Sequence, residues 1–138
     1  EPAHNLDNVM EAIELLGTAG GIGHKNLVLS TVGDPRVFER LMALPVGQVR
    51  PALALSLHST RPALRAQLLP RAPQIDIEAL VDGGEAYARA SGYPIQYQWA
   101  LLDGINDDIH LYDYASDAPI PPALDVQLDQ LTYGTTVK

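Results

Sequence analysis

The 138-residue sequence contains no cysteine. This absence excludes a disulfide framework, a thiolate zinc site and, within this chain, any iron–sulfur cluster held by cysteine. Positive charge is also scarce, with nine lysines and arginines against seventeen acidic residues and a formal net charge of -8. Because proteins bind phosphate backbones through a local excess of Lys and Arg, this segment alone is not expected to bind nucleic acid.

The sequence has no long apolar run. No stretch approaches the roughly 20 residues that a membrane helix needs, and no basic-then-apolar leader is present, which predicts a soluble, cytoplasmic chain without membrane contact. The first residue is Glu1 rather than Met, which leaves open that the natural N-terminus lies upstream. A hydrophobic content of 46% is enough to bury the core of one domain or of part of one.

Three apolar runs that end in polar residues are predicted to be buried strands. The runs cover residues 27–33, 52–57 and 95–102. The polar residues at their ends are Ser30, Thr31, Ser56, His58 and Asp103. In a parallel sheet the carboxyl ends of the strands meet at one edge, so we expect these side chains to lie on a common rim, with Glu1 beside them.

Between the strands, apolar residues recur at helical spacing behind capping residues and prolines. This predicts helices over residues 6–16, 35–44, 62–69 and 76–90, with Asp34 and a hydroxyl of Ser59 or Thr60 as caps and Gly92 as the stop of the last helix. Strands that alternate with helices indicate parallel βαβ units. We interpret the fold as α/β, a partial parallel (β/α) barrel, although spacing alone also permits an open doubly wound sheet.

Several residues have both a chemical and a structural interpretation. His58 has the chemistry of a general base, or it is hydrogen-bonded at a strand end for structural reasons. Ser30 and Thr31 contact a ligand or cap the turn that follows, and capping is the simpler interpretation. A triad of Ser56, His58 and Asp103 lacks the Gly-x-Ser-x-Gly elbow that would support it.

Two loops invite a binding-site interpretation. The glycine-rich segment 17–23 follows a helix and precedes a strand, the reverse of the order in phosphate-binding loops, so we expect a connector. Asp103, Asp107 and Asp108 would suit a magnesium ion, but solvated turn carboxylates are the commoner outcome. The four histidines form no pair at helical metal-binding spacing, so no metal site is predicted.

The pattern weakens after residue 108. Residues 109–115 and 135–138 are possible strands and residues 121–131 a possible helix, so we divide the chain into a core, 1–108, and a remainder of the same domain, 109–138. A parallel neighbour needs a crossover of a dozen or more residues, and none fits between Asp108 and Ile109. Our hypothesis is that a segment is missing there.

Four motifs, taken in order, carry a family resemblance. They are Glu1–Val9, Leu29–Gly33, Leu53–His58 and Leu101–Asp107. Together they resemble the RlmN/Cfr family of radical SAM enzymes, which methylate carbon 2 or 8 of adenine in RNA. The resemblance implies a partial barrel of the radical SAM type that binds S-adenosylmethionine, and RNA (rRNA or tRNA) as the partner of the full-length protein.

Carried over to this sequence, the resemblance implies five cofactor-binding residues. Glu1 would hold the methionyl amine of S-adenosylmethionine and Ser30 would meet the ligand. Ser56, Leu57 and His58 would line its nucleoside or carboxylate side.

The chain departs from the family because the cysteine motif for the [4Fe–4S] cluster and the methyl-carrying cysteine are both absent. A cluster would therefore need cysteines outside this chain, and the chain as it stands is expected to be inactive. It is either a truncated or degenerate fragment, or separate pieces of a longer polypeptide joined in one sequence. The alternative function is a non-catalytic scaffold or interaction module that self-associates through open strand edges.

Overall fold

The computed structural model describes residues 1–107. The predicted strands and helix within 109–138, and the hypothesis of a missing segment between Asp108 and Ile109, lie outside the described residues. The helices are α1 (Leu6–Gly17), α2 (Pro35–Met42), α3 (Pro62–Leu68) and α4 (Ile77–Ser91), the strands are β1 (Val28–Thr31), β2 (Ala52–Ser56) and β3 (Gln96–Gln98), and short 3-10 helices cover Pro2–His4 and His24–Asn26.

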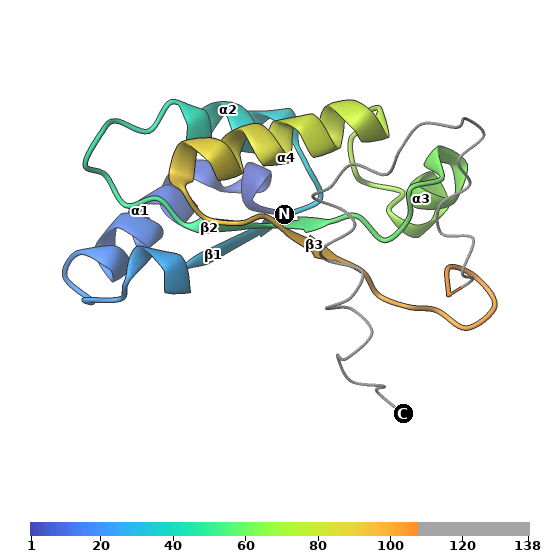
Figure 1. Cartoon of the computed structure of the whole chain (residues 1–138), viewed down its shortest axis with the longest axis horizontal. Helices are drawn as coiled ribbons and strands as arrows, with labels where there is room; N and C mark the ends of the chain where they lie inside the picture. The colour runs from blue at the N-terminus through green and yellow to red at the C-terminus, as the bar shows by residue number, and fades with distance from the viewer. Residues whose placement is uncertain (108–138) are drawn as a thin grey trace.

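The three strands form one parallel sheet in the order β1-β2-β3. Thr31 pairs with Leu55, and Leu55 pairs with Tyr97, so the carboxyl ends of the strands lie at one edge. Helices α2 and α4 lie together over one face of the sheet, and α3 follows the end of β2 (Figure 1). The predicted alternation of parallel strands and helices is confirmed.

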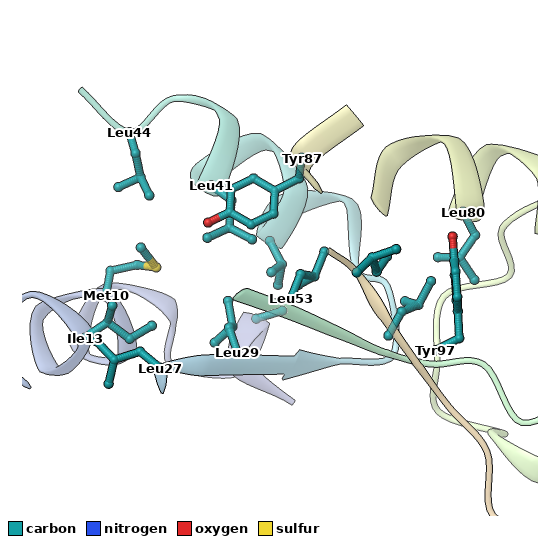
Figure 2. Packing of buried hydrophobic residues seen from close by; sticks show 14 of the residues in the cluster. Met10, Ile13, Leu27, Leu29, Leu41, Leu44, Leu53, Leu80, Tyr87 and Tyr97 are labelled. Carbon is teal, nitrogen blue, oxygen red and sulfur yellow. The ribbon is translucent and has the colours of Figure 1, made fainter. Parts of the chain in front are cut away.

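The sheet has two different faces because side chains alternate along each strand. Leu29, Leu53, Leu55 and Tyr97 point to the face covered by helices and are buried. Their partners include Leu41 from α2 and Leu80 and Tyr87 from α4, while Met10 and Ile13 from α1 lie at the other end of the cluster from Leu80 and Tyr97 (Figure 2). The opposite face carries Val28, Ser30, Ala52, Ala54, Ser56, Gln96 and Gln98.

Strand β3 is shorter than predicted. The sequence favoured a strand over 95–102, but the sheet pairing ends at Gln98. Beyond it the amide of Ala100 donates to Nδ1 of His58 over 2.9 Å, and the amide of Leu102 donates to Oδ1 of Asn106 over 2.6 Å. Side chains therefore take the backbone donors that a longer strand would have used in the sheet.

Capping side chains and a glycine mark several of the helix ends. The carboxylate of Asp34 accepts the amide of Arg36, and Gly92 ends α4 in the left-handed region, as predicted. Asp76, where the predicted helix begins, is the N-cap of α4, and its carboxylate accepts the amide of Ala79. The predicted hydroxyl cap of α3 is wrong. Its N-cap is Arg61, which makes no side-chain cap bond, and the hydroxyl of Ser59 instead accepts the Arg61 amide in a turn before the helix.

The predicted apolar stripes of α1 and α2 are wider than the buried faces. Leu15, Leu16 and Met42 continue the helical spacing of apolar residues in the sequence but are exposed. Among residues 1–107, no helix combines the length and apolar character that crossing a membrane requires.

Gly33 allows α4 to approach the end of β1. Its φ of +95° lies in the region that favours glycine, and a Cβ there would come within 2.0 Å of Cδ1 of Leu80. In α4, a Cβ at Gly83 would be 3.6 Å from the ring of Phe38, an ordinary contact.

Substituting these two glycines should therefore have opposite effects. We expect Gly33→Ala to lower the free energy of unfolding by about 2–4 kcal/mol, through backbone strain and overpacking. Gly83→Ala should raise it by about 0.5–1 kcal/mol because it removes a glycine from a helix interior. Urea unfolding followed by circular dichroism measures both, and similar losses for the two variants would contradict the packing of Leu80 on Gly33.

Candidate functional site

Polar side chains from all three strands meet at the carboxyl edge of the sheet. The hydroxyls of Ser30 on β1 and Ser56 on β2 both donate to Oε1 of Gln98 on β3, over 2.8 and 3.4 Å. The sequence predicted the two serines as site residues, but Gln98 was read only as part of a strand. Gln98 is the last residue of β3 and is in register with Ser56, a placement that the sequence alone did not indicate.

The carboxylate of Glu1 is fixed at the end of β1. Its Oε1 accepts the hydroxyl of Thr31 over 2.6 Å, and its Oε2 accepts the amide of Val32 over 2.8 Å. Thr31 also accepts the amide of Gly33 over 3.0 Å, which confirms its predicted role in the turn. A carboxylate has about four lone-pair sites, so Glu1 keeps acceptor capacity on each oxygen for a further donor.

His58 is held in an unusual backbone conformation directly after β2. Its φ is 59°, and no other non-glycine residue among residues 1–107 has a positive φ. Asn106, which is fully buried, donates from its amide to the carbonyls of His58 and Ala100, each over 2.8 Å. The sequence placed Asn106 in a turn-rich loop without assigning it this role.

The imidazole of His58 is oriented by the backbone. Because Nδ1 accepts the Ala100 amide, the neutral ring carries its proton on Nε2. Burial, and then the charge of Arg65, lowers the pKa of His58 below its usual value of 6.5. The ring is therefore a neutral hydrogen-bond donor near pH 7, with the nitrogen that could accept a proton already engaged. This arrangement favours the structural interpretation of His58 over a general base.

Arg65 on α3 is a buried cation beside this edge. It is 4% exposed, and its Nη2 donates to the carbonyls of Val32 over 2.6 Å and Ser56 over 3.5 Å. Within residues 1–107 it forms no ion pair, its Nε has no partner, and burial lowers its pKa. Arg65 thus joins the ends of β1 and β2. The apolar residues of the predicted helix over 62–69, at Leu64, Leu68 and Leu69, gave no indication of this role for Arg65.

The structure also locates the other predicted residues. The side chain of Leu57 lies in the hydrophobic core at 1% exposure, so a ligand would meet only its backbone. Asp103 makes no hydrogen bond to His58, whose Nδ1 is occupied, so the unsupported triad does not form. Asp107 accepts the amide of Gly104 over 2.9 Å as a turn carboxylate, and Asp108 lies outside the described residues.

Two regions outside the strand ends are a hollow beside α1 and the glycine-rich segment 17–23. The described residues contain no group of His, Cys, Asp and Glu side chains that could hold a metal ion. A hollow beside α1 is lined by Met10, Glu14 and Val49 among others, none of them from the strand ends. Glu14 accepts the amide of Val49 there, which gives its carboxylate a structural role. The glycine-rich segment connects α1 to the second 3-10 helix, as predicted.

Similar proteins are known, although no family model matches the chain. It is 78% identical over 107 residues to a probable RNA methyltransferase of Methylibium petroleiphilum and 72% identical over 113 residues to one of Pseudomonas aeruginosa. These alignments cover 78% and 82% of the chain but 30% and 32% of the relatives, so the chain spans about a third of their length.

A solved structure is similar as well. The crystal structure of a radical SAM methyltransferase from Sphaerobacter thermophilus matches with a TM-score of 0.69 and 27% identity, over 80% of this chain and 32% of that one. This likeness confirms the predicted α/β fold with a parallel sheet as a fragment of the radical SAM type.

The lowered pKa of His58 makes stability depend on pH. The unfolded chain binds more protons than the folded one just below pH 6.5, so the contribution of a neutral His58 is complete above that pH and is lost as the pH falls through the folded pKa. We expect His58→Gln to flatten the decline in unfolding free energy between about pH 7 and 5. Urea unfolding at a series of pH values measures this, and an unchanged slope would contradict it.

The contribution of Arg65 can be isolated by NMR titration of the imidazole. Arg65→Met should move the pKa of His58 up towards its ordinary value, whereas Arg65→Lys should keep it low because the charge remains. Arg61→Met, at an exposed residue of the same segment, is the matched control. Equal shifts in all three variants would exclude a specific effect of the Arg65 charge.

Proposed function

The chain belongs to the radical SAM RNA methyltransferase family, since 78–82% of it aligns with the two RNA methyltransferases above, and we propose that it forms the S-adenosylmethionine-binding part of such an enzyme. The observation that carries this proposal is the meeting of a carboxylate, two hydroxyls and a primary amide at one sheet edge. This set is complementary to a ligand that carries an ammonium group and ribose hydroxyls.

In this proposal Glu1 binds the methionyl ammonium. Its two oxygens are held by Thr31 and Val32 and retain free lone pairs, so a cation can be bound without moving the side chain. Ser30, Ser56 and the backbone of Leu57 and His58 meet the remainder of the ligand. S-adenosylmethionine supplies the methyl group, and these residues bind and orient it.

An iron–sulfur cluster does not fit the residues of this chain. The 138 residues contain no cysteine, the ligand that such clusters require. We propose that the cluster is held by cysteines outside these residues, and that the chain alone binds S-adenosylmethionine without methyl transfer. We also propose that the RNA substrate binds to other parts of the whole protein, because this segment has a net charge of -8. The whole protein is proposed to act in the cytoplasm.

Calorimetric titration of the chain with S-adenosylmethionine tests the proposed site. Glu1→Gln keeps an acceptor but removes the charge, and we expect it to weaken binding about 10- to 100-fold, as for the loss of a charge-assisted hydrogen bond. Glu39→Gln, at an exposed glutamate of α2, should leave affinity unchanged.

A second ligand localises the effect. Affinity for 5′-methylthioadenosine, which lacks the amino acid, should be the same in Glu1→Gln and in the unmodified chain. Loss of affinity for both ligands would argue against Glu1 as the partner of the ammonium group, and no binding of S-adenosylmethionine at millimolar concentration would refute the proposed site.

A second candidate function follows from the sheet edges. Within residues 1–107 the sheet has three strands, so the outer edges of β1 and β3 have no strand beside them. Such edges favour pairing with another chain, as in a scaffold or interaction module. Light scattering separates the two functions, because a monomer that binds S-adenosylmethionine supports the first and an oligomer that does not bind it supports the second.

A further inference from the structure

Gln98 is the centre of the hydrogen bonds at the sheet edge. Its Oε1 accepts from Ser30 over 2.8 Å and from Ser56 over 3.4 Å, and the side chain of Gln98 is exposed. Ser30 and Gln98 come from the two outer strands, and 68 positions separate them in the sequence. The amide therefore connects all three strands at the rim.

The middle strand makes this contact possible. Ser30 lies level with Ala54 on β2, and Ser56 lies level with Gln98 on β3, all on the face opposite the helices. The alanine side chain is a single methyl group, so it does not separate the hydroxyl of Ser30 from the amide of Gln98. A larger residue at this position would stand between them.

The bonds fix which atoms remain for a ligand. A serine hydroxyl has one proton, and both serines give theirs to Oε1 of Gln98. Towards a ligand, Ser30 and Ser56 then present only lone pairs. The Nε2 of Gln98, on the other side of the amide, presents two N–H donors. The rim is thus an acceptor at the serines and a donor at the glutamine.

We propose that Gln98 sets this hydrogen-bond polarity and contacts a ribose hydroxyl of S-adenosylmethionine. A hydroxyl donates to a serine oxygen and accepts from Nε2, so it satisfies both sides of the rim. A carboxylate only accepts and would face the serine lone pairs, whereas an ammonium group only donates and is better matched by Glu1. The inference rests on the proposed function and adds to it a residue and a ligand group.

Two ligands and two variants test the inference. Calorimetry compares S-adenosylmethionine with its 2′,3′-dideoxyribose analogue, in the unmodified chain, in Gln98→Ala and in Gln96→Ala. Gln96 is the matched control because it lies two residues earlier on the same strand and face, and is also exposed. Circular dichroism verifies that both variants keep the fold.

Gln98→Ala should weaken binding of S-adenosylmethionine about tenfold, as for the loss of one or two hydrogen bonds. It should leave affinity for the dideoxy analogue unchanged, and Gln96→Ala should affect neither ligand. Equal weakening for both ligands, or no weakening in Gln98→Ala, would overturn the role of Gln98 while leaving the cofactor site intact. No binding of S-adenosylmethionine by the unmodified chain would instead refute the site and this inference together.

Discussion

The burial of β2 is the constraint on which the other elements depend. Ala52, Leu53, Ala54 and Leu55 are each at most 4% exposed, with β1 and β3 paired on either side. A strand in that position must have its neighbours in a fixed register, because a shift of one residue would move its leucines to the opposite face. The register of β2 therefore determines which side chains of β1 and β3 reach the carboxyl edge.

That edge combines a neutral imidazole with a cation that lacks a carboxylate partner among residues 1–107. Arg65 is buried, and its donors point to backbone carbonyls at the ends of β1 and β2. Removing a guanidinium from water costs free energy, and partial carbonyl charges offset only part of that cost. The edge is therefore electropositive at Arg65 and electronegative at Glu1.

Much of the fold could be predicted because its signals are local. Asp34 and Asp76 cap helices through residues two or three positions away, and Gly92 ends α4 through its own backbone angles. The strand cores followed from apolar runs. Where local signals misled, another partner took the backbone group, as when Ala100 bonded to His58 rather than extending β3.

Only part of the candidate site could be predicted, because some of its contacts join residues far apart in the sequence. Ser30, Ser56 and His58 end apolar runs and were visible, whereas Gln98 and Arg65 act through partners 68 and 33 positions away. An arginine on a short helix and a glutamine in a strand have no local property that indicates such contacts. Only the register of the sheet brings them to the rim.

The bond from Asn106 to His58 has a consequence for how the protein is made. It spans 48 residues and fixes the turn that follows β2. The N-terminus of a chain leaves the ribosome first, and domains begin to fold during synthesis. Strands β1 and β2 and helix α4 therefore emerge before the bond from Asn106 to His58 can form. The three strands can thus pair before the turn after β2 is fixed. The turn at His58 is completed only after residue 106 has left the exit tunnel, later than the bonds of Ser30 and Ser56 to Gln98, which need no residue beyond 98.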